Sequence, residues 1–311
     1  MILCICLNPA LQRTLFFSSL QWNNVNRAVK TQWTGGGKGV NVGRIIHQLN
    51  HDVLVLLPAG GWTGNQLEHI LKKEKIPSYI IQTQQSTRIC ETLINTPDSS
   101  YTEIVQESEI FTDKEVESVL KCVDQYIERA DFVVLSGTVP GGFDPGIYQQ
   151  FVHKVQDKGK KAIVDATGCQ LIKAISAQPW LIKPNWHEVE HTFKCTLHTN
   201  TEMLKTMAVM SEQGANNVLV TRSGPEAILL HNNQAYILKS PELHVVNPIG
   251  SGDAFTAGVA VRYCRTQDFL DAVKFGMACA GANVLTSLAG HVSLSDVKKI
   301  YSQIICESVG F

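Results

Sequence analysis

The chain has 311 residues, of which 44% are hydrophobic and 18% are charged, and its formal net charge is −1. These values are typical of an ordinary globular protein. The lack of a basic cluster argues against a protein that binds nucleic acid through a basic surface patch. No apolar run approaches the ~20 residues that a membrane helix needs, so we expect neither nucleic acid nor a membrane as a partner.

The apolar N-terminal run MILCICL has no basic region before it and ends at Asn8-Pro9, so we predict a first strand rather than a signal peptide. Cys4 and Cys6 would share one face of that strand. Because no second cysteine pair completes a metal site, we expect both to be small core residues. The nine cysteines, an odd number, argue against a disulfide framework and favour a reducing cytoplasm.

Apolar, β-branched runs alternate with helical patterns along most of the chain. Such alternation predicts a parallel sheet with helices on both faces. The segment from Ala254 to Cys306 is expected to be mostly helical. The predicted strands are 52–57, 131–137, 161–167, 179–185 and 216–224, and the predicted helices are 112–130 and 144–157.

Two regions, about 9–34 and 79–108, are richer in Thr, Gln and Ser and contain alternating stretches such as RICETLIN and SYTEIVQ. Alternation is typical of strands with one open face. We therefore expect one small antiparallel sheet, built from two excursions, that lies over the edge of the main unit as a lid. No repeat or linker interrupts the chain, so residues 1–311 are predicted to form a single domain.

A first glycine cluster, WTGGGKGVNVGRIIHQL, spans residues 33–49. It is not a Walker A loop, because Gly39 follows Lys38 where Ser or Thr is required, and no G-x-G-x-x-G spacing fits. What remains is a glycine-rich loop that leads into a helix. Bare glycines let a polyhydroxy ligand approach the backbone, and Asn41 could donate to and accept from sugar hydroxyls. A plain helix start with an exposed lysine is the alternative.

The second glycine cluster, VVNPIGSGDAFTAGVAV, spans residues 245–261. The backbone freedom of Gly250 and Gly252 would let successive N–H groups converge on an anion beside Asp253, and a helix that starts there would point its positive end at the same place. The alternative is a tight strand-to-helix turn in which Asp253 only favours the helix N-terminus.

The segment KPNWHEVEH, residues 183–191, can be interpreted in two ways. His187, Glu188 and His191 match H-E-x-x-H, the zinc-peptidase signature, although Lys194 and Leu197 break its metzincin extension. In the other interpretation, K-P-N-x-x-E, Lys183 and Asn185 lie at the carboxyl end of a strand and Glu188 on the next turn. That arrangement suits nucleotide phosphates and a Mg²⁺ ion held through water.

Together these motifs resemble the pfkB-type, ribokinase-like carbohydrate kinases, and within them the branch of 1-phosphofructokinase and tagatose-6-phosphate kinase. The resemblance extends in order over essentially the whole chain: LNPAL, GGGKGVNVGR, STR (86–88), LSGTVPGG (135–142), KPNWHE, VTRSG (220–224) and NPIGSGDAFTAG. It implies a ribokinase-like three-layer α/β/α sandwich with a mainly parallel sheet and a small antiparallel β lid. It also implies an enzyme that uses ATP and Mg²⁺.

The resemblance further implies a role for each motif. Asp253 would be the catalytic base that takes the proton of the sugar hydroxyl, while the backbone of Gly250, Ser251 and Gly252 would stabilise the transferring phosphoryl group. Glu188 would hold Mg²⁺ through water. The implied substrate-binding residues are Gln12, Gly36, Gly37, Lys38, Asn41, Arg88 and Thr138, and the implied nucleotide-binding residues are Lys183, Asn185, Thr221, Ser223, Gly224 and Asn283.

Three positions depart from the family pattern. The family has N-P-x-x-D near the start, where this chain has Gln12, so a charge-assisted contact to sugar hydroxyls is lost. The nucleotide loop S-L-G-x-x-G is written TRSGPE at 221–226, which bears on nucleotide preference, and S-G-S-L-P is written SGTVP at 136–140.

We therefore expect a cytoplasmic kinase that phosphorylates a hydroxyl of a phosphorylated ketohexose, with fructose 1-phosphate as first acceptor and tagatose 6-phosphate as second. A lid that pairs between subunits would make it a homodimer. Two alternatives of another class stay open: a zinc peptidase, and a sugar-phosphate-binding protein without turnover, which the departure at Gln12 allows.

Overall fold

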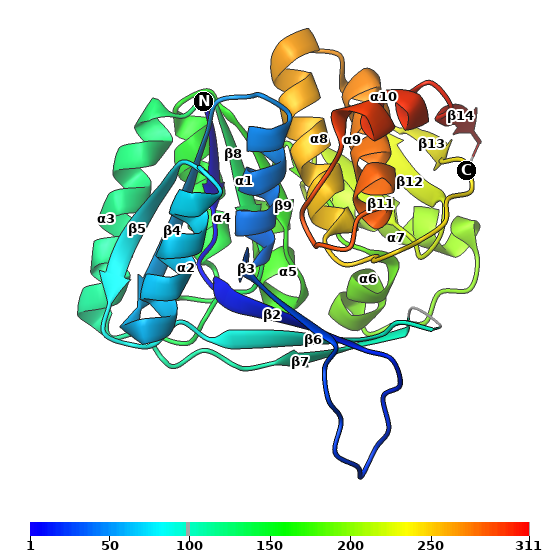
Figure 1. Ribbon diagram of the computed structural model, residues 1–311. Helices are drawn as coiled ribbons and strands as arrows, with labels where there is room; N and C mark the ends of the chain where they lie inside the picture. Colours follow the sequence, from blue (N-terminus) through cyan, green and yellow to red (C-terminus); the bar gives the residue numbers. More distant parts are fainter. Residues whose placement is uncertain (98–99, 311) are drawn as a thin grey trace.

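A ten-stranded sheet forms the middle layer of the computed structural model, which describes residues 1–97 and 100–310 (Figure 1). Its strands are parallel from β11 to β5 and antiparallel from β11 through β14. In spatial order they are β14 (Ile305–Val309), β13 (Gln234–Lys239), β12 (Glu226–His231), β11 (Asn217–Thr221), β10 (Leu181–Ile182), β9 (Lys161–Asp165), β8 (Phe132–Ser136), β1 (Ile2–Ile5), β4 (Val53–Gly60) and β5 (Ser78–Thr83).

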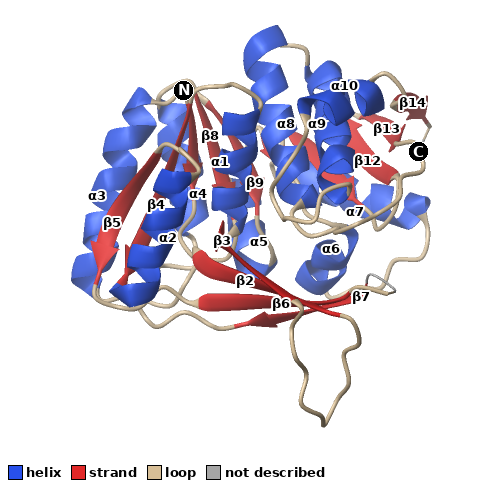
Figure 2. Ribbon diagram, viewed as in Figure 1, coloured by secondary structure: helices blue, strands red, loops and turns tan. Residues whose placement is uncertain are grey.

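Helices cover both faces of this sheet (Figure 2). Successive side chains of a strand point to opposite faces, and β1 accordingly sends Ile2 and Cys4 into one core and Leu3 and Ile5 into the other. The first core is covered by α1 (Lys38–Gln48), α2 (Gly61–Lys73), α8 (Ser251–Thr266), α9 (Phe269–Val284) and α10 (Leu294–Tyr301). The second is covered by α3 (Asp113–Arg129), α4 (Ile147–Asp157), α5 (Gly168–Ser176), α6 (Trp186–Phe193) and α7 (Asn200–Glu212).

The three-layer α/β/α arrangement predicted from the sequence is thus confirmed, with Cys4 and Cys6 buried in the same core. The expected helical character after Ala254 is confirmed by α8, α9 and α10. Among the described residues, no helix combines the length and apolar character needed to cross a membrane.

A four-stranded sheet lies below the large one, in the order β3 (Lys30–Gly36), β2 (Ala10–Phe17), β6 (Ile89–Asn95) and β7 (Ser100–Val105) (Figure 1). It is the predicted lid, and its outer pairs are antiparallel. Its central pair, β2 with β6, is parallel. β2 follows β1 and β6 follows β5, two parallel strands of the large sheet, so both leave that sheet in the same direction.

The predicted lid segment 79–108 begins too early. Residues 78–83 form β5, which pairs with β4 in the large sheet rather than with the lid. The predicted strand 179–185 is also shorter in the structure, since β10 covers only Leu181–Ile182. Pro179 and Pro184 lack the N–H group that a ladder needs, which limits regular pairing on both sides.

The hairpin of β12 and β13 was not predicted. Its two strands are joined at Asn232 and Asn233, which have φ values of 50° and 58°. Two consecutive positive φ values are typical of a type I′ turn, for which asparagine is a favoured residue. The pair of asparagines between apolar runs was therefore a usable sequence signal.

Candidate active site

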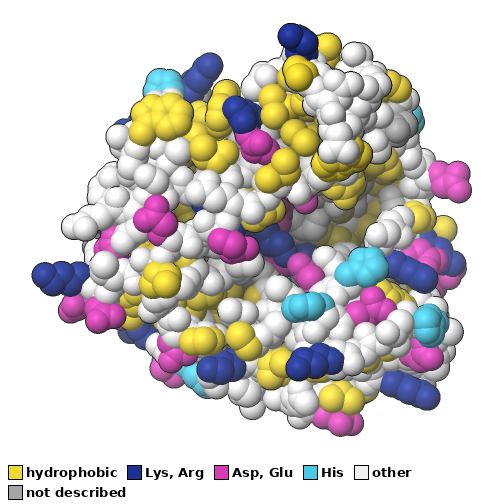
Figure 3. All heavy atoms as spheres, turned by 90° about the horizontal axis from the view of Figure 1, so that it is seen from below, with side chains coloured by type: hydrophobic (Ala, Val, Ile, Leu, Met, Phe, Trp, Pro, Cys, Tyr) yellow, Lys and Arg dark blue, Asp and Glu magenta, His cyan; other side chains and the backbone are white. Residues whose placement is uncertain are grey.

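A cavity of about 1010 Å³ lies between the lid and the carboxyl edge of the parallel strands. Ligands of open α/β sheets bind at this edge. Seen from the lid side, acidic and basic side chains gather around a hollow (Figure 3). Both glycine clusters, the lid, the 183–188 segment and the 221–226 loop contribute to its wall. Of the sequence-predicted site residues, all but Thr138 and Asn283 line it.

The second glycine cluster forms the turn that starts α8. Gly250 has φ 82°, and a Cβ atom there would lie 2.6 Å from the backbone nitrogen of Gly290, so the turn requires glycine. The first N–H groups of a helix have no partner within it, and the residues that begin α8 line the cavity beside Asp253. The predicted tight turn is confirmed, and the anion site stays a prediction that this turn allows.

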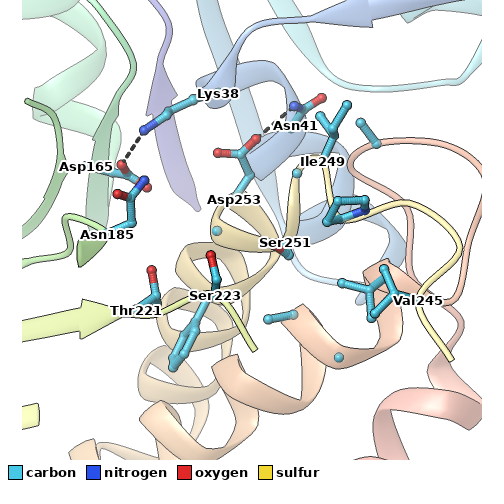
Figure 4. A pocket seen from close by; sticks show the side chains of 18 of the residues that line it. Lys38, Asn41, Asp165, Asn185, Thr221, Ser223, Val245, Ile249, Ser251 and Asp253 are labelled. Atoms are coloured by element: carbon cyan, nitrogen blue, oxygen red, sulfur yellow. Dashed lines mark hydrogen bonds and ion pairs between the residues drawn. The ribbon is translucent and has the colours of Figure 1, made fainter. Parts of the chain in front are cut away.

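Asp253 lies in the first turn of α8 with only 6% of its surface exposed. Burial, followed by the nearby charge of Asp165, raises the pKa of Asp253 to about 7. The charges of Lys38 and Lys183 and a hydrogen bond from Asn41 oppose that rise. Asn41 donates this bond from Nδ2 to Oδ2 at 2.8 Å (Figure 4). A carboxylate with such a pKa can accept a proton near neutral pH.

Asp165, at the end of β9, was missed in the sequence and forms the charged centre of the site. Lys38 Nζ lies 2.9 Å from its Oδ1, and Lys183 Nζ lies 2.8 Å from its Oδ2. Thr256 of α8 also donates a 3.3 Å hydrogen bond to Oδ2. Burial alone would raise the pKa of Asp165, but the charges of Lys183 and Lys38 outweigh it and hold that pKa below its usual range. The signal was available, because Asp165 ends a predicted strand at the ligand-binding edge.

The first glycine cluster brings Lys38 into the same network. Gly37 has φ 102°, and a Cβ atom on Gly39 would lie 2.6 Å from Cys6 Cβ, so loop and helix pack directly against β1. Lys38 Nζ also bonds Glu188 Oε1 at 2.8 Å. Lys38 does begin α1, and its side chain is 38% exposed, but its ammonium group connects two carboxylates across the cavity floor.

Asn41 has a different environment from the one expected. Its Oδ1 accepts a 2.9 Å hydrogen bond from Arg44 Nη1, while its Nδ2 donates to Asp253. Its oxygen thus already accepts one bond within the protein, and its second lone pair and the second N–H of Nδ2 remain for sugar hydroxyls.

The lid contributes Gln12 and Arg88. Gln12 lines the cavity, and its Nε2 donates to Thr92 Oγ1 at 2.9 Å. Arg88 donates to the backbone carbonyls of Asn8, Pro9 and Gln106 at 3.1, 3.4 and 3.3 Å. Thr138 lies outside the cavity wall, where its Oγ1 accepts a 2.9 Å bond from Asn8 Nδ2.

The predicted nucleotide end is built around the start of α6. Asn185 Oδ1 accepts from the backbone of Glu188 at 2.8 Å, and Glu188 Oε2 accepts from the backbone of Asn185 at 2.7 Å. This reciprocal capping box orders the helix start. Thr221 forms a bridge with Asn185, and Gly224 turns the following loop with φ 103°. One side of the cavity holds Asn185, Thr221 and Ser223 (Figure 4), and Lys183 and Gly224 also line it.

Asn283 does not reach this wall. It is completely buried, its Nδ2 donates to the carbonyl of Ile249 at 2.9 Å, and its Oδ1 accepts from Gly290 and His291 at 2.9 and 3.2 Å. Its amide thus ties the loop before α8 to the loop after α9. The predicted contact with adenine does not fit this placement, since other residues of α9 line the cavity.

The H-E-x-x-H match does not form a zinc site. His187 is 84% exposed and contacts Glu190, while Glu188 bonds Lys38 and its own helix cap. Within residues 1–97 and 100–310, no group of three or more His, Cys, Asp or Glu side chains could hold a metal ion without further ligands. A zinc-peptidase centre needs three protein ligands, so this interpretation is not supported.

Comparison with known proteins identifies the family of this chain. Residues 10–296 match the model of the pfkB family of carbohydrate kinases. The chain resembles a candidate 1-phosphofructokinase from Thermotoga maritima, with 26% identity, TM-score 0.91 and 100% of both chains covered. It also resembles a protein from Staphylococcus aureus described as a candidate phosphofructokinase, with 27% identity, TM-score 0.81 and 99% of both chains covered. A ribokinase of Arabidopsis thaliana, 18% identical with TM-score 0.73 over 96% of this chain and 98% of that one, shares the ribokinase-like fold. The chain belongs to the pfkB family of carbohydrate kinases.

Proposed function

We propose that this kinase transfers the γ-phosphoryl group of ATP to a hydroxyl of a phosphorylated ketohexose, with fructose 1-phosphate as the first acceptor and fructose 1,6-bisphosphate as the product. The observation that carries the proposal is the position of Asp253. It is a buried carboxylate with a pKa of about 7, at the N-terminus of α8, in a cavity lined by glycines and by lid residues.

In this reaction Asp253 accepts the proton of the attacking hydroxyl as the oxygen attacks the γ-phosphorus in line and the bond to the β-phosphate oxygen breaks. The backbone N–H groups of Gly250, Ser251 and Gly252 and the positive end of α8 stabilise the negative charge on the transferring group. Positioning and electrostatic stabilisation supply most of the catalysis in phosphoryl transfer, and this site offers both.

The donor set near the cavity floor is compatible with Mg²⁺. Asp165 and Glu188 supply carboxylate oxygens to the same ammonium group, Lys38 Nζ, so both face one point. Mg²⁺ keeps several waters and takes one or two carboxylates plus phosphate oxygens, which this pair allows. When bound, the ion would neutralise charge on the phosphates.

A phosphorylated acceptor fits the cations at the lid end. Within residues 1–97 and 100–310, Arg88 donates to neutral backbone carbonyls, two of them at 3.3 Å or longer, and forms no ion pair with a carboxylate. A sugar phosphate would supply that partner, and guanidinium groups bind phosphate in a fork. Tagatose 6-phosphate satisfies the same requirement and is the second acceptor to test.

Assembly through the lid belongs to the same proposal. Trp33 and Ile104, on the face of the lid turned away from the cavity, are 41% and 49% exposed. The phosphofructokinase-2 of Escherichia coli, 22% identical to this chain, has a tetrameric inhibited form. A homodimer through the lid would cover these two side chains.

ADP release in the presence of ATP and Mg²⁺, with a panel of free and phosphorylated sugars, tests the function. We expect fructose 1-phosphate to stimulate ADP release most, and Asp253→Asn to lower kcat by about 10²–10⁴-fold, the range for a general base. If no sugar phosphate stimulates ADP release, or if Asp253→Asn keeps a near-normal rate, the proposal is wrong. Binding of a sugar phosphate without turnover would favour the non-catalytic alternative.

A further inference from the structure

Arg44, in the second turn of α1, is a charged residue with only 2% of its surface exposed. Taking a charge out of water is costly unless it is paired and hydrogen-bonded. The proposed reaction gives Arg44 no role, and the sequence offered no reason to separate it from other helix residues. Its burial therefore requires an explanation.

Three bonds hold its guanidinium in place. Nε donates to Glu74 Oε2 at 2.7 Å, Nη2 donates to the carbonyl of Gly35 at 2.6 Å, and Nη1 donates to Asn41 Oδ1 at 2.9 Å. Glu74 balances the charge, while the bond to Gly35 ties the group to the glycine loop. The third bond leads towards the reacting centre.

That third bond has a directional consequence. A guanidinium can only donate hydrogen bonds, so Asn41 must turn its carbonyl oxygen to Arg44 and its amino group to Asp253 (Figure 4). The reverse orientation would place two groups of donors, Nδ2 and Nη1, against each other. It would also place the Asn41 carbonyl against the Asp253 carboxylate.

We propose that Arg44 is a positioning residue, which fixes the side-chain amide of Asn41 so that its amino group always faces Asp253. Like the catalytic role of Asp253, this assignment rests on the proposed function. The oriented amide supplies a donor to Oδ2 and favours the ionised carboxylate, the form that accepts a proton. It also holds Asp253 with its Oδ1 free for the acceptor hydroxyl.

The packing around Asn41 supports a fixed orientation. A Cβ atom on Gly290 would lie 2.9 Å from Asn41 Oδ1, so the loop after α9 packs closely over the amide. Asn283, in turn, holds Gly290 through its backbone nitrogen. Within this packed site, a turned amide would leave Nδ2 without an acceptor and Asp253 without its donor, and unsatisfied buried polar groups are costly.

Two variants separate amide orientation from charge. In Arg44→Lys the new side chain is still donor-only, so the amide of Asn41 should keep its orientation. In Arg44→Met/Glu74→Met both charges of the pair are removed together, so the net charge near Asp253 is unchanged while the directional donor is lost. Arg44→Gln/Glu74→Gln is a second charge-neutral pair in case the methionine pair fails to fold, and its amide can present either a donor or an acceptor to Asn41.

The readout is the titration of Asp253 itself, by NMR of protein with ¹³C-labelled aspartate carboxyl groups, with the signal assigned by its loss in Asp253→Asn. We expect Arg44→Lys to titrate close to the wild type, and the charge-neutral pairs to raise the pKa of Asp253 by about one pH unit. The other groups that act on Asp253, namely Asp165, Lys38, Lys183 and Cys6, are the same in all variants, and His291, which also faces Arg44, is retained.

The proposal is overturned if both charge-neutral pairs titrate like the wild type, or if Arg44→Lys shifts as far as they do. Where turnover is measurable, a rise of one pH unit predicts about a five-fold loss of kcat at pH 7 that recovers near pH 9, with the KM for ATP unchanged. A purely structural role would lower activity equally at both pH values. Failure of the wild type to phosphorylate any sugar phosphate would contradict only the proposed function, because the titration needs no substrate.

Discussion

Lys38 Nζ lies 2.9 Å from Asp165 Oδ1, although 127 positions separate the two residues in the chain. One begins α1 and the other ends β9, and the large sheet brings both to the same edge. Lys183 occupies the second oxygen of Asp165, and Glu188 shares Lys38. The charges that surround Asp253 are therefore arranged as one network of ion pairs.

The first prediction concerns the pH dependence of the proposed activity. The pKa of Asp253 is raised to about 7, and the base must be ionised to accept a proton. We expect kcat/KM for the sugar phosphate to rise with pH through about 7 and to level off above it. A profile of kcat/KM between pH 5 and 9 checks this. If kcat/KM is already constant over that range, as for a base with a pKa near 4, Asp253 is not the titrating base.

Asp253 should also lower the stability of the fold at high pH. Because the pKa of Asp253 in the folded protein lies above its ordinary value of 3.8, its contribution to stability is fully favourable below pH 3.8 and is lost as the pH rises through about 7. Asp253→Asn removes this loss, so we expect it to stabilise the protein by about 1–3 kcal/mol at pH 8 and by less at pH 5. Urea unfolding at both pH values measures the difference. An equal effect at pH 5 and 8 would contradict the assigned pKa.

Of the residues in this network, Asp165 should contribute most to the stability of the fold. It is 1% exposed, and Lys183, 3% exposed, depends on it for its charge partner. Asp165→Asn should cost about 3–5 kcal/mol, as expected when one partner of a buried ion pair is removed. Adding Lys183→Met should recover part of that loss, as measured by chemical unfolding. If the double variant is less stable than the single one, the two residues are not coupled as the structure indicates.

Gln12 should tune sugar affinity rather than turnover. Gln12→Ala removes a neutral hydrogen-bonding group from the lid face of the cavity, so the KM for the sugar phosphate should rise about 2–10-fold, equivalent to 0.5–1.5 kcal/mol. Gln12→Asp should lower that KM, because charge-assisted hydrogen bonds are about twice as strong. Steady-state kinetics at saturating ATP provide the test, with the KM for ATP as the control. A parallel change in both KM values would place Gln12 outside the sugar site.

The histidines of the HEVEH segment should be dispensable. His187 is 84% exposed and contacts Glu190, and His191 is also exposed. The variant His187→Ala/His191→Ala should keep kcat within about two-fold, as is usual for surface substitutions, and should not change bound zinc measured by mass spectrometry. Loss of activity together with loss of zinc would revive the zinc interpretation.

Most of the predicted site residues line the cavity, because glycine turns and strand ends leave local signals in the sequence. The turn at Gly250 needs a positive φ, and the K-P-N-x-x-E segment carries a capping box that orders α6. Residues whose role depends on long-range pairing gave weaker signals. Asp165 resembled any strand-terminal acid, Arg44 any helix cation, and Asn283 was assigned to adenine although it bonds two loops.

Local patterning by itself determined the alternating elements, the two-sided parallel sheet and the position of the α8 turn, because side-chain periodicity and backbone freedom act over a few residues. Only the tertiary structure decided that Asp165 balances two lysines, that β2 runs parallel to β6, and that Arg44 orients Asn41 towards Asp253. They depend on residues that lie far apart in the chain: 127 positions separate Lys38 from Asp165, and 212 separate Asn41 from Asp253. Electrostatic and hydrogen-bond energies depend on distance and burial in space, and separation along the sequence specifies neither.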